Sequence, residues 1–192
     1  MPKLGMEPIR RAELIDAAIA EIGEAGSLDI TVARIARRAG VSSGLAHHYF
    51  GNKDQLLLAA MRHVMSDYSD EVRKGLKAAN TPIERLTAIV HGGFAPSNFR
   101  ANTVSAWLNF YVLALSSREA RRLHRIYAHR LRSNLTHTLR PLAAARAPQI
   151  ADRAAALIDG FYLNYGLDAQ LPDGAVAAEI VMAAIVRDIA DS

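Results

Sequence analysis

Residues 31–56 constrain the fold of this chain most strongly, because they predict two short helices joined by a sharp turn. The first helix has one apolar face, formed by residues at helical spacing: Val32, Ile35, Ala36 and Ala39. Gly40 can adopt the positive φ that a tight turn requires. Ser42 can cap the second helix, since its hydroxyl accepts a hydrogen bond from a backbone N–H that lacks a partner within the helix. Together these signals predict a helix-turn-helix.

The surface of this motif is predicted to be polar and positive. The second helix carries mainly small and polar residues, which suit DNA edges and phosphates better than a core. Residues 31–53 contain no Asp or Glu but several basic residues: Arg34, Arg37, Arg38 and Lys53. A block of one sign suits a surface that faces phosphates. An ordinary helical hairpin with a solvated basic face is the alternative, and the agreement of cap, turn and charge favours DNA binding.

The rest of the chain also predicts helices. Gly and Pro are sparse and lie mainly at predicted boundaries, and no run of alternating β-branched residues indicates a sheet. Thr81 and Glu84 form a capping box around a first-turn proline, which marks a helix start. Prolines predict a break over residues 141–148 and a turn over residues 172–174. We therefore expect an all-α fold of about nine helices.

The order of these helices predicts two parts. Residues 1–51 would form a three-helix DNA-binding head, with the helix-turn-helix at about residues 31–50. Residues 52–192 would form a larger helical body. The first helix of the body directly follows the motif, so a shift in the body can be passed rigidly to the head.

Composition and motifs exclude several functions. The chain has 192 residues, a net charge of +4 and no cysteine, so disulfides and thiolate sites are excluded. The N-terminus lacks the apolar core of a signal peptide and no apolar run is long enough to span a bilayer, so we expect a cytoplasmic protein without a membrane partner. No nucleotide-binding or hydrolase motif is present, and no histidines are paired at helical spacing. We expect no enzyme activity, no cofactor and no metal.

One set of residues in and after the helix-turn-helix has characteristic spacings: Thr31, Ile35-Ala36, Ala39-Gly40-Val41-Ser42, Gly44, Tyr49-Phe50, Lys53 and Leu56. With these residues the chain resembles the TetR family of bacterial repressors. Three further segments resemble the BetI subfamily, the choline-responsive repressors of the glycine betaine synthesis operon: M-P-K-L-G-M-E-P-I-R-R at the start, A-W-L-N-F-Y at 106–111 and A-L-I-D-G-F-Y-L at 156–163.

The resemblance implies a homodimer that represses transcription. The last two helices of each subunit would form a four-helix bundle at the dimer interface, and residues 52–192 would serve ligand binding and dimerisation. The dimer would bind a double-stranded DNA operator that controls glycine betaine synthesis from choline. Choline or a related quaternary ammonium compound would release it. The alternative is a TetR-type repressor that responds to other lipophilic cations or small molecules, as multidrug regulators do.

The candidate DNA-binding residues lie in and around the motif: Thr31, Arg34, Ser42, Ser43, Gly44, Leu45, His47, His48, Tyr49 and Lys53. Leu45 could contact a thymine methyl group, and Gly44 would let the backbone approach DNA closely. Tyr49 and Lys53 match positions that contact phosphates in the family. A core position between head and body is the alternative for Tyr49.

The candidate ligand-binding residues are an aromatic set with one carboxylate: Trp107, Phe110, Tyr111, Asp159 and Tyr162. The first three share one face of a helix. Aromatic faces with a nearby carboxylate suit a quaternary ammonium ion, which has a diffuse charge and no hydrogen-bond donors on its nitrogen. The alternative is that the aromatic residues form core and that Asp159 pairs with an arginine across the dimer.

Overall fold

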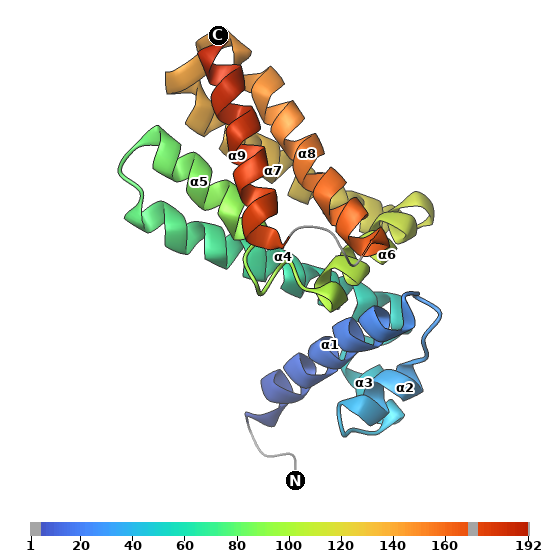
Figure 1. Cartoon of the computed structure of the whole chain (residues 1–192). Coiled ribbons are helices and arrows are strands. Elements are labelled where there is room, and N and C mark those ends of the chain that lie inside the picture. Colours follow the sequence, from blue (N-terminus) through green and yellow to red (C-terminus); the bar gives the residue numbers. More distant parts are fainter. Residues whose placement is uncertain (1–4, 169–172, 192) are drawn as a thin grey trace.

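The computed structural model describes residues 5–168 and 173–191, and this part of the chain is helical without strands (Figure 1). The predicted all-α fold is confirmed. The α-helices are α1 (Met6–Ala25), α2 (Val32–Arg38), α3 (Ser43–Phe50), α4 (Lys53–Ala78), α5 (Pro82–Gly93), α6 (Ala101–Ser116), α7 (Arg118–Ala143), α8 (Ala147–Leu167) and α9 (Gly174–Ala190), with the short 3-10 helix η1 (Ala144–Arg146).

The helices form two groups joined by α4. In Figure 1, α1–α3 lie together below, α5 and α7–α9 lie above, and α4 runs between the groups. The predicted boundary after residue 51 falls at the junction of α3 and α4, where Gly51 has a φ of 78° and Asn52 caps α4. The division into two domains stays a prediction, because α1 packs on both α4 and α6.

The local signals in the sequence act as expected. Gly40 has a φ of 66°, and the Ser42 hydroxyl accepts a hydrogen bond from the Leu45 N–H at 3.2 Å. The capping box at the start of α5 is complete, since Thr81 and Glu84 each bond the other residue's backbone. These features depend on neighbouring residues alone, which explains why the sequence reveals them.

The predicted break over residues 141–148 is wrong for most of its length. Helix α7 continues through Pro141 to Ala143, and α8 begins at Ala147, so only η1 separates them. The buried residues Leu135, Leu139 and Ala143 continue one stripe of α7 through the proline. Their packing outweighs the backbone hydrogen bond that proline cannot form. Part of the predicted 172–174 turn, Pro172, lies outside the described residues.

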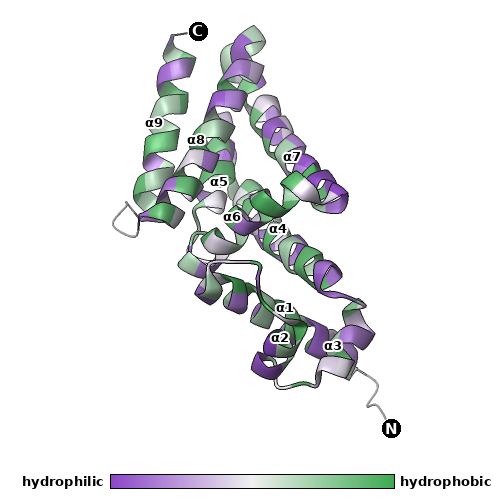
Figure 2. Cartoon of the chain, turned by 90° about the vertical axis from the view of Figure 1, so that its right-hand side faces the viewer, coloured by the Kyte–Doolittle hydropathy of each residue, from purple (hydrophilic) through white to green (hydrophobic). Residues whose placement is uncertain are grey.

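Hydrophobic and hydrophilic residues are mixed along the helices, as Figure 2 shows. In the described parts of the chain, no helix combines the length and the hydropathy needed to cross a membrane.

Helix α1 contacts α6 of the body at Gly23. A Cβ atom added to Gly23 would lie 2.7 Å from the Asn102 Cα, which is shorter than the van der Waals contact distance between two carbon atoms. One turn away on α6, the Ser105 hydroxyl donates to the Ile22 carbonyl at 3.4 Å. Glycine therefore permits a backbone approach that no other residue allows, and α1 cannot move independently of α6.

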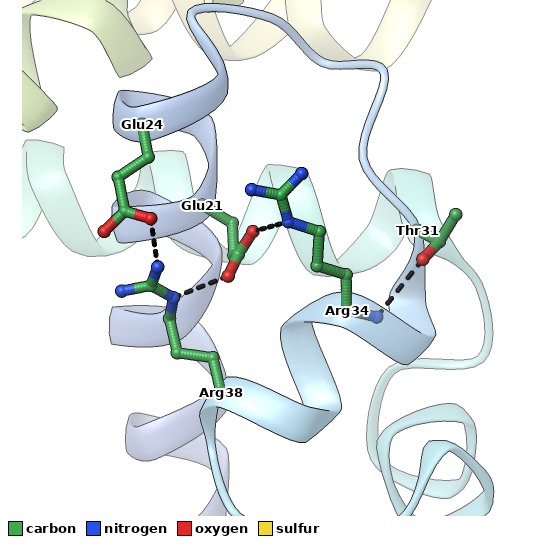
Figure 3. A network of polar contacts seen from close by, with 5 residues as sticks. All are labelled: Glu21, Glu24, Thr31, Arg34 and Arg38. Carbon is green, nitrogen blue, oxygen red and sulfur yellow. Dashed lines mark hydrogen bonds and ion pairs between the residues drawn. The ribbon is translucent and has the colours of Figure 1, made fainter.

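Helix α2 is attached to α1 by an ion-pair network (Figure 3). The Glu21 side chain is only 5% exposed and accepts a hydrogen bond from the Arg38 Nε at 2.6 Å. Arg34 pairs with the other Glu21 oxygen, and Arg38 also pairs with Glu24. The hydrogen bond from Arg38 is the main cause that lowers the pKa of Glu21, against the opposing effect of burial. The network fixes the orientation of the helix that precedes the turn.

Substitution of Glu21 tests this network. Glu21→Gln should lower the free energy of unfolding by about 1–3 kcal/mol, because it removes charged hydrogen bonds at a buried position. The folded state lowers the pKa of Glu21 below its usual 4.5. The ionised Glu21 carboxylate therefore contributes to the free energy of unfolding above pH 4.5, and this contribution is lost as the pH falls through the folded-state pKa. Denaturant unfolding from pH 7 to pH 3 measures both effects.

Glu24→Gln is the matched control, since Glu24 is 50% exposed on the same helix. Its effect should stay below about 1 kcal/mol, as for most surface ion pairs. Equal effects of the two substitutions, or a Glu21→Gln deficit that does not shrink as the pH falls, would contradict the assigned role of Glu21.

Candidate functional site

Helix α3 presents one face outward. Only Ala46 and Phe50 of this helix are buried. The remaining predicted contact residues of α3 are exposed or half-buried: Ser43, Gly44, Leu45, His47, His48 and Tyr49. An added Cβ on Gly44 would meet no atom closer than 4.0 Å, so the space in front of this residue is open. The structure therefore brings the candidate base-reading residues onto one accessible helix.

The helix caps flank this face. The Thr31 and Ser42 hydroxyls accept hydrogen bonds from the Arg34 and Leu45 N–H groups, each at 3.2 Å. Each hydroxyl hydrogen is still able to donate to a phosphate oxygen. Lys53 is the first residue of α4, where the helix dipole adds positive potential. The caps and the helix start thus form a line of potential phosphate contacts.

His47 and His48 have different surroundings. The His47 Nδ1 lies 3.0 Å from the Gly51 carbonyl oxygen, so in neutral His47 this nitrogen carries the proton and donates. The His47 Nε2 is then an acceptor. The His48 ring instead lies 5.5 Å from the Tyr49 ring, centroid to centroid. Of the two histidines, His47 has a hydrogen bond that favours one tautomer, which leaves its Nε2 as an acceptor.

The positive surface is weaker than the sequence predicts. Arg34 and Arg38 pair with Glu21 and Glu24 of α1, so the acid-free block in the sequence is not acid-free in space. Within the described residues, Arg37 and Lys53 form no ion pair. The sequence analysis compared charges only within residues 31–53 and therefore missed acids from another helix. Arg34 stays a predicted DNA contact, although its guanidinium already pairs with a carboxylate.

Helix α1 also holds the end of α3. The Arg11 guanidinium donates to the Tyr49 carbonyl at 2.6 Å and lies 4.5 Å over the Phe50 ring. Phe50 is 8% exposed, as expected for a core residue. Tyr49 is half-buried and packs against the core, and its contact with phosphate stays a prediction.

The aromatic residues of the body meet around Trp107. Its ring centroid lies 5.8 Å from that of Tyr111, 6.1 Å from Phe110 and 6.3 Å from Tyr162. Trp107, Phe110 and Tyr162 are buried, while Tyr111 is half-buried. We call these four residues, together with Tyr68 and Tyr127, the aromatic cluster.

Two members of the aromatic cluster were missed by sequence reasoning. Tyr127 of α7 lies 4.6 Å from Trp107, and Tyr68 of α4 lies 5.8 Å from Tyr127, between ring centroids. Both stand alone in polar helices, where no aromatic spacing draws attention to them. The signal that could have found them is an aromatic residue on the buried stripe of an otherwise charged helix.

Asp159 lies at the edge of the aromatic cluster. The Tyr111 hydroxyl donates to the Asp159 Oδ1 at 3.1 Å. Although part of Asp159 is exposed, the surrounding protein removes enough water to raise the pKa of its carboxyl group. Burial also raises the pKa values of Tyr111 and Tyr162, so both hydroxyls stay neutral and can donate. The Tyr162 hydroxyl donates to the Gly93 carbonyl at 2.5 Å.

A cleft of about 530 Å³ opens beside this carboxylate. Its lining combines apolar and polar residues: Tyr111, Ala114, Leu115, Arg121, His124, Asp159, Gly160 and Leu163. Tyr111 and Asp159 thus belong to both the cleft and the edge of the cluster. The rings of the cluster contact one another, so a ligand among them would have to separate helices α4, α6, α7 and α8. Among residues 5–168 and 173–191, no group of three or more His, Asp or Glu side chains could hold a metal ion.

Helices α8 and α9 expose an apolar face in the single chain. The exposed residues are Leu157, Leu163 and Leu167 of α8 and Val176, Ile180 and Val186 of α9. Their neighbours Ile158, Val181 and Ile185 are buried within the chain. The apolar residues of α9 therefore lie on both an inner and an outer face. An outer face of this composition is typical of a protein–protein contact.

Two protein-family models match the chain. The model described as "Bacterial regulatory proteins, tetR family" matches residues 14–60. The model described as "BetI-type transcriptional repressor, C-terminal" matches residues 82–190. The first match contains α2 and α3, and the second contains the aromatic residues of α6, α7 and α8.

Several known proteins are similar over almost the whole chain. An HTH-type transcriptional regulator BetI from Brucella suis is 53% identical over 182 residues, which cover 94% of this chain and 92% of the relative. The protein of that name from Rhizobium meliloti is 51% identical over 168 residues, covering 87% of this chain and 83% of the relative.

The fold is also similar to solved structures. A putative transcriptional regulator from Pseudomonas aeruginosa PAO1 has a TM-score of 0.81 and 26% identity, covering 95% of this chain and 91% of the other. A putative transcriptional regulator from Saccharomonospora viridis, solved in complex with choline, has a TM-score of 0.78 and 21% identity, covering 89% and 92%. The second likeness, at this identity, concerns the fold alone.

Proposed function

This chain belongs to the TetR family of bacterial regulatory proteins and has a BetI-type C-terminal domain, and we propose that it represses glycine betaine synthesis until choline or a related quaternary ammonium compound releases it from its operator. Membership of the family makes the chain a DNA-binding transcriptional regulator of the repressor type and not an enzyme. The observation that carries the choline assignment is the aromatic cluster with Asp159 at its edge, all of which except Tyr68 lies inside the BetI-type domain.

The aromatic cluster has the chemistry that a quaternary ammonium ion needs. Trp107, Tyr111 and Tyr162 come from two helices and offer ring faces, which attract a diffuse positive charge. Asp159 adds a carboxylate that Tyr111 holds in place. Phe110 packs behind Trp107 and supports the position of its ring. The choline-bound state of a regulator with the same fold is consistent with this assignment.

Ligand entry would alter the head through two helices. A cation between Trp107 and Tyr162 must separate rings whose centroids are now 6.3 Å apart. Helix α6 would then carry α1 with it through the contact at Gly23, and α4 would move with Tyr68. The ligand shifts the equilibrium only if it binds the separated state more tightly. Couplings of this kind are typically about 1–3 kcal/mol, which changes operator affinity roughly 5–150-fold.

We also propose that the repressor is a homodimer. The exposed apolar face of α8 and α9 would be covered by the same face of a second copy, because two-fold symmetry pairs a surface with itself. The two copies of α3 would enter successive major grooves about 34–36 Å apart, or a multiple of this distance. The operator should therefore be a palindrome.

Within each half-site the residues divide into two roles. Ser43, Leu45, His47 and His48 face the base edges, with the His47 Nε2 able to accept a hydrogen bond from an exocyclic amine of adenine or cytosine. The remaining candidates contact phosphates or allow close approach: Thr31, Arg34, Ser42, Gly44, Tyr49 and Lys53.

A second candidate function is a response to larger lipophilic cations. The cleft beside Asp159 has a volume of about 530 Å³ and includes Ala114, Leu115 and Leu163 in its lining. This space exceeds that needed for choline and suits an apolar cation. Binding selectivity between choline and a bulky cationic dye decides between the two candidates.

Replacement of Lys53 tests the DNA interface. Lys53→Ala should weaken binding to all duplexes and lower the slope of log affinity against log salt by roughly 0.9 for each phosphate that the lysine neutralises. Fluorescence anisotropy with operator and unrelated duplexes at several salt concentrations measures the slope. Lys74→Ala is the control, since Lys74 lies far along α4 and pairs with Glu71 at 2.7 Å. An unchanged slope for Lys53→Ala would show that Lys53 does not bind phosphate.

Fluorescence of Trp107 tests the ligand site directly, because the chain has a single tryptophan. Choline should change this emission saturably, and Asp159→Asn should weaken choline binding by about tenfold, or roughly 1.4 kcal/mol. Asp152→Asn is the matched control on the same helix, where Asp152 pairs with Arg132 at 2.9 Å on the surface. Equal choline affinity in both variants would contradict the role of Asp159. Tight dye binding without choline binding would instead support the second candidate.

A further inference from the structure

A second groove lies between α4 and α7, apart from the cleft beside Asp159. Its volume is about 520 Å³. The residues on its α4 wall recur at helical spacing: Arg62, Met65, Ser66, Tyr68, Ser69, Val72, Arg73 and Leu76. The span from Arg62 to Leu76 covers 15 residues of helix, or about 21 Å from the first Cα to the last. The groove is therefore long.

The polar groups of this groove are positive or neutral. Three guanidinium groups line it, from Arg62 and Arg73 on α4 and Arg130 on α7, and no Asp or Glu belongs to its described lining. Arg73 pairs with Asp70 at 2.7 Å. Arg62 and Arg130 form no ion pair within the described residues, and they lie on opposite walls. The groove thus presents two uncompensated positive charges facing a shared space.

The groove also has an apolar lining and a buried polar atom without a partner. Met65, Val72 and Leu76 of α4 and Leu123 of α7 contribute apolar side chains. The Tyr68 hydroxyl oxygen is buried and has no hydrogen-bond partner within the described residues. A buried hydroxyl without a partner costs about 1–3 kcal/mol, so a polar ligand atom that reached it would add stability.

We propose that this groove binds an amphiphilic organic anion, an alkyl chain that ends in a carboxylate. The apolar side chains of the groove contact the alkyl chain, and Arg62 and Arg130 form ion pairs with the carboxylate. A quaternary ammonium ion would be repelled by the same guanidinium groups, so the groove and the aromatic cluster select ligands of opposite charge.

The position of the groove makes its occupant a second effector. Tyr68 and Tyr127 line the groove and also belong to the aromatic cluster. Helix α4 forms one wall and continues directly from the DNA-binding head. An anion between α4 and α7 would therefore act on the same helix as the cation.

Calorimetry with decanoate tests the proposal, at constant ionic strength and below the concentration at which decanoate aggregates. Decanoate should bind the full chain saturably, with one site per chain. Arg62→Gln and Arg130→Gln should each weaken this binding by about tenfold, because each removes a charged hydrogen bond. Arg125→Gln should leave it unchanged, since Arg125 is exposed on α7 but does not line the groove. Thermal melts establish that the exposed variants remain folded.

Two comparison ligands separate the effect of charge from that of the alkyl chain. Decanol and decyltrimethylammonium carry the same chain without the negative charge, and both should bind at least tenfold more weakly than decanoate at the Arg130-dependent site. Absence of saturable decanoate binding would overturn the proposal. Equal affinity for all three ligands, or an equally weakened Arg125→Gln variant, would also overturn it, because the groove would then have no charge selectivity of its own.

Discussion

The close approach of α1 and α6 at Gly23 is the constraint on which communication between the two ends of the molecule depends. An added Cβ would overlap the Asn102 Oδ1 and lie 2.7 Å from the Asn102 Cα, so there is no room for a side chain at position 23. Asn102 alone contributes a side chain at this contact, so few rotamer changes can absorb a displacement. Movement of α6 must therefore carry α1 with it, or the contact must break.

Because of that contact, three features of the structure can link the aromatic cluster to the DNA-binding head. Trp107 and Tyr111 lie on α6, so a ligand that separates the aromatic rings acts on the same helix as Asn102. Glu21 lies two residues before Gly23 and fixes α2 through its pairs with Arg34 and Arg38. The Arg11 contact with Tyr49 fixes the end of α3. The head can then respond as one rigid unit, and its spacing in a dimer can change without unfolding.

The sequence predicted the features that neighbouring residues determine, and it missed those that packing determines. The Gly40 turn and the Ser42 cap depend on a few adjacent residues, and helical spacing identified the aromatic residues of α6. Sequence reasoning could not place Glu21 beside Arg34, nor bring Tyr68 and Tyr127 to Trp107, since those pairs join different helices. It also predicted a break at Pro141, although the buried stripe of α7 holds the helix intact. The individual DNA and ligand contacts stay predictions.

The distance between the two heads of the proposed dimer tests the central claim most directly. The chain contains no cysteine, so Ala33→Cys places one spin label on the exposed surface of α2 in each subunit. Electron–electron double resonance then measures the distance between labels with and without choline. The account predicts a shifted distance at choline concentrations that release the operator. An unchanged distance, with the operator still released, would contradict transmission from the aromatic cluster through α6 and α1 to the head.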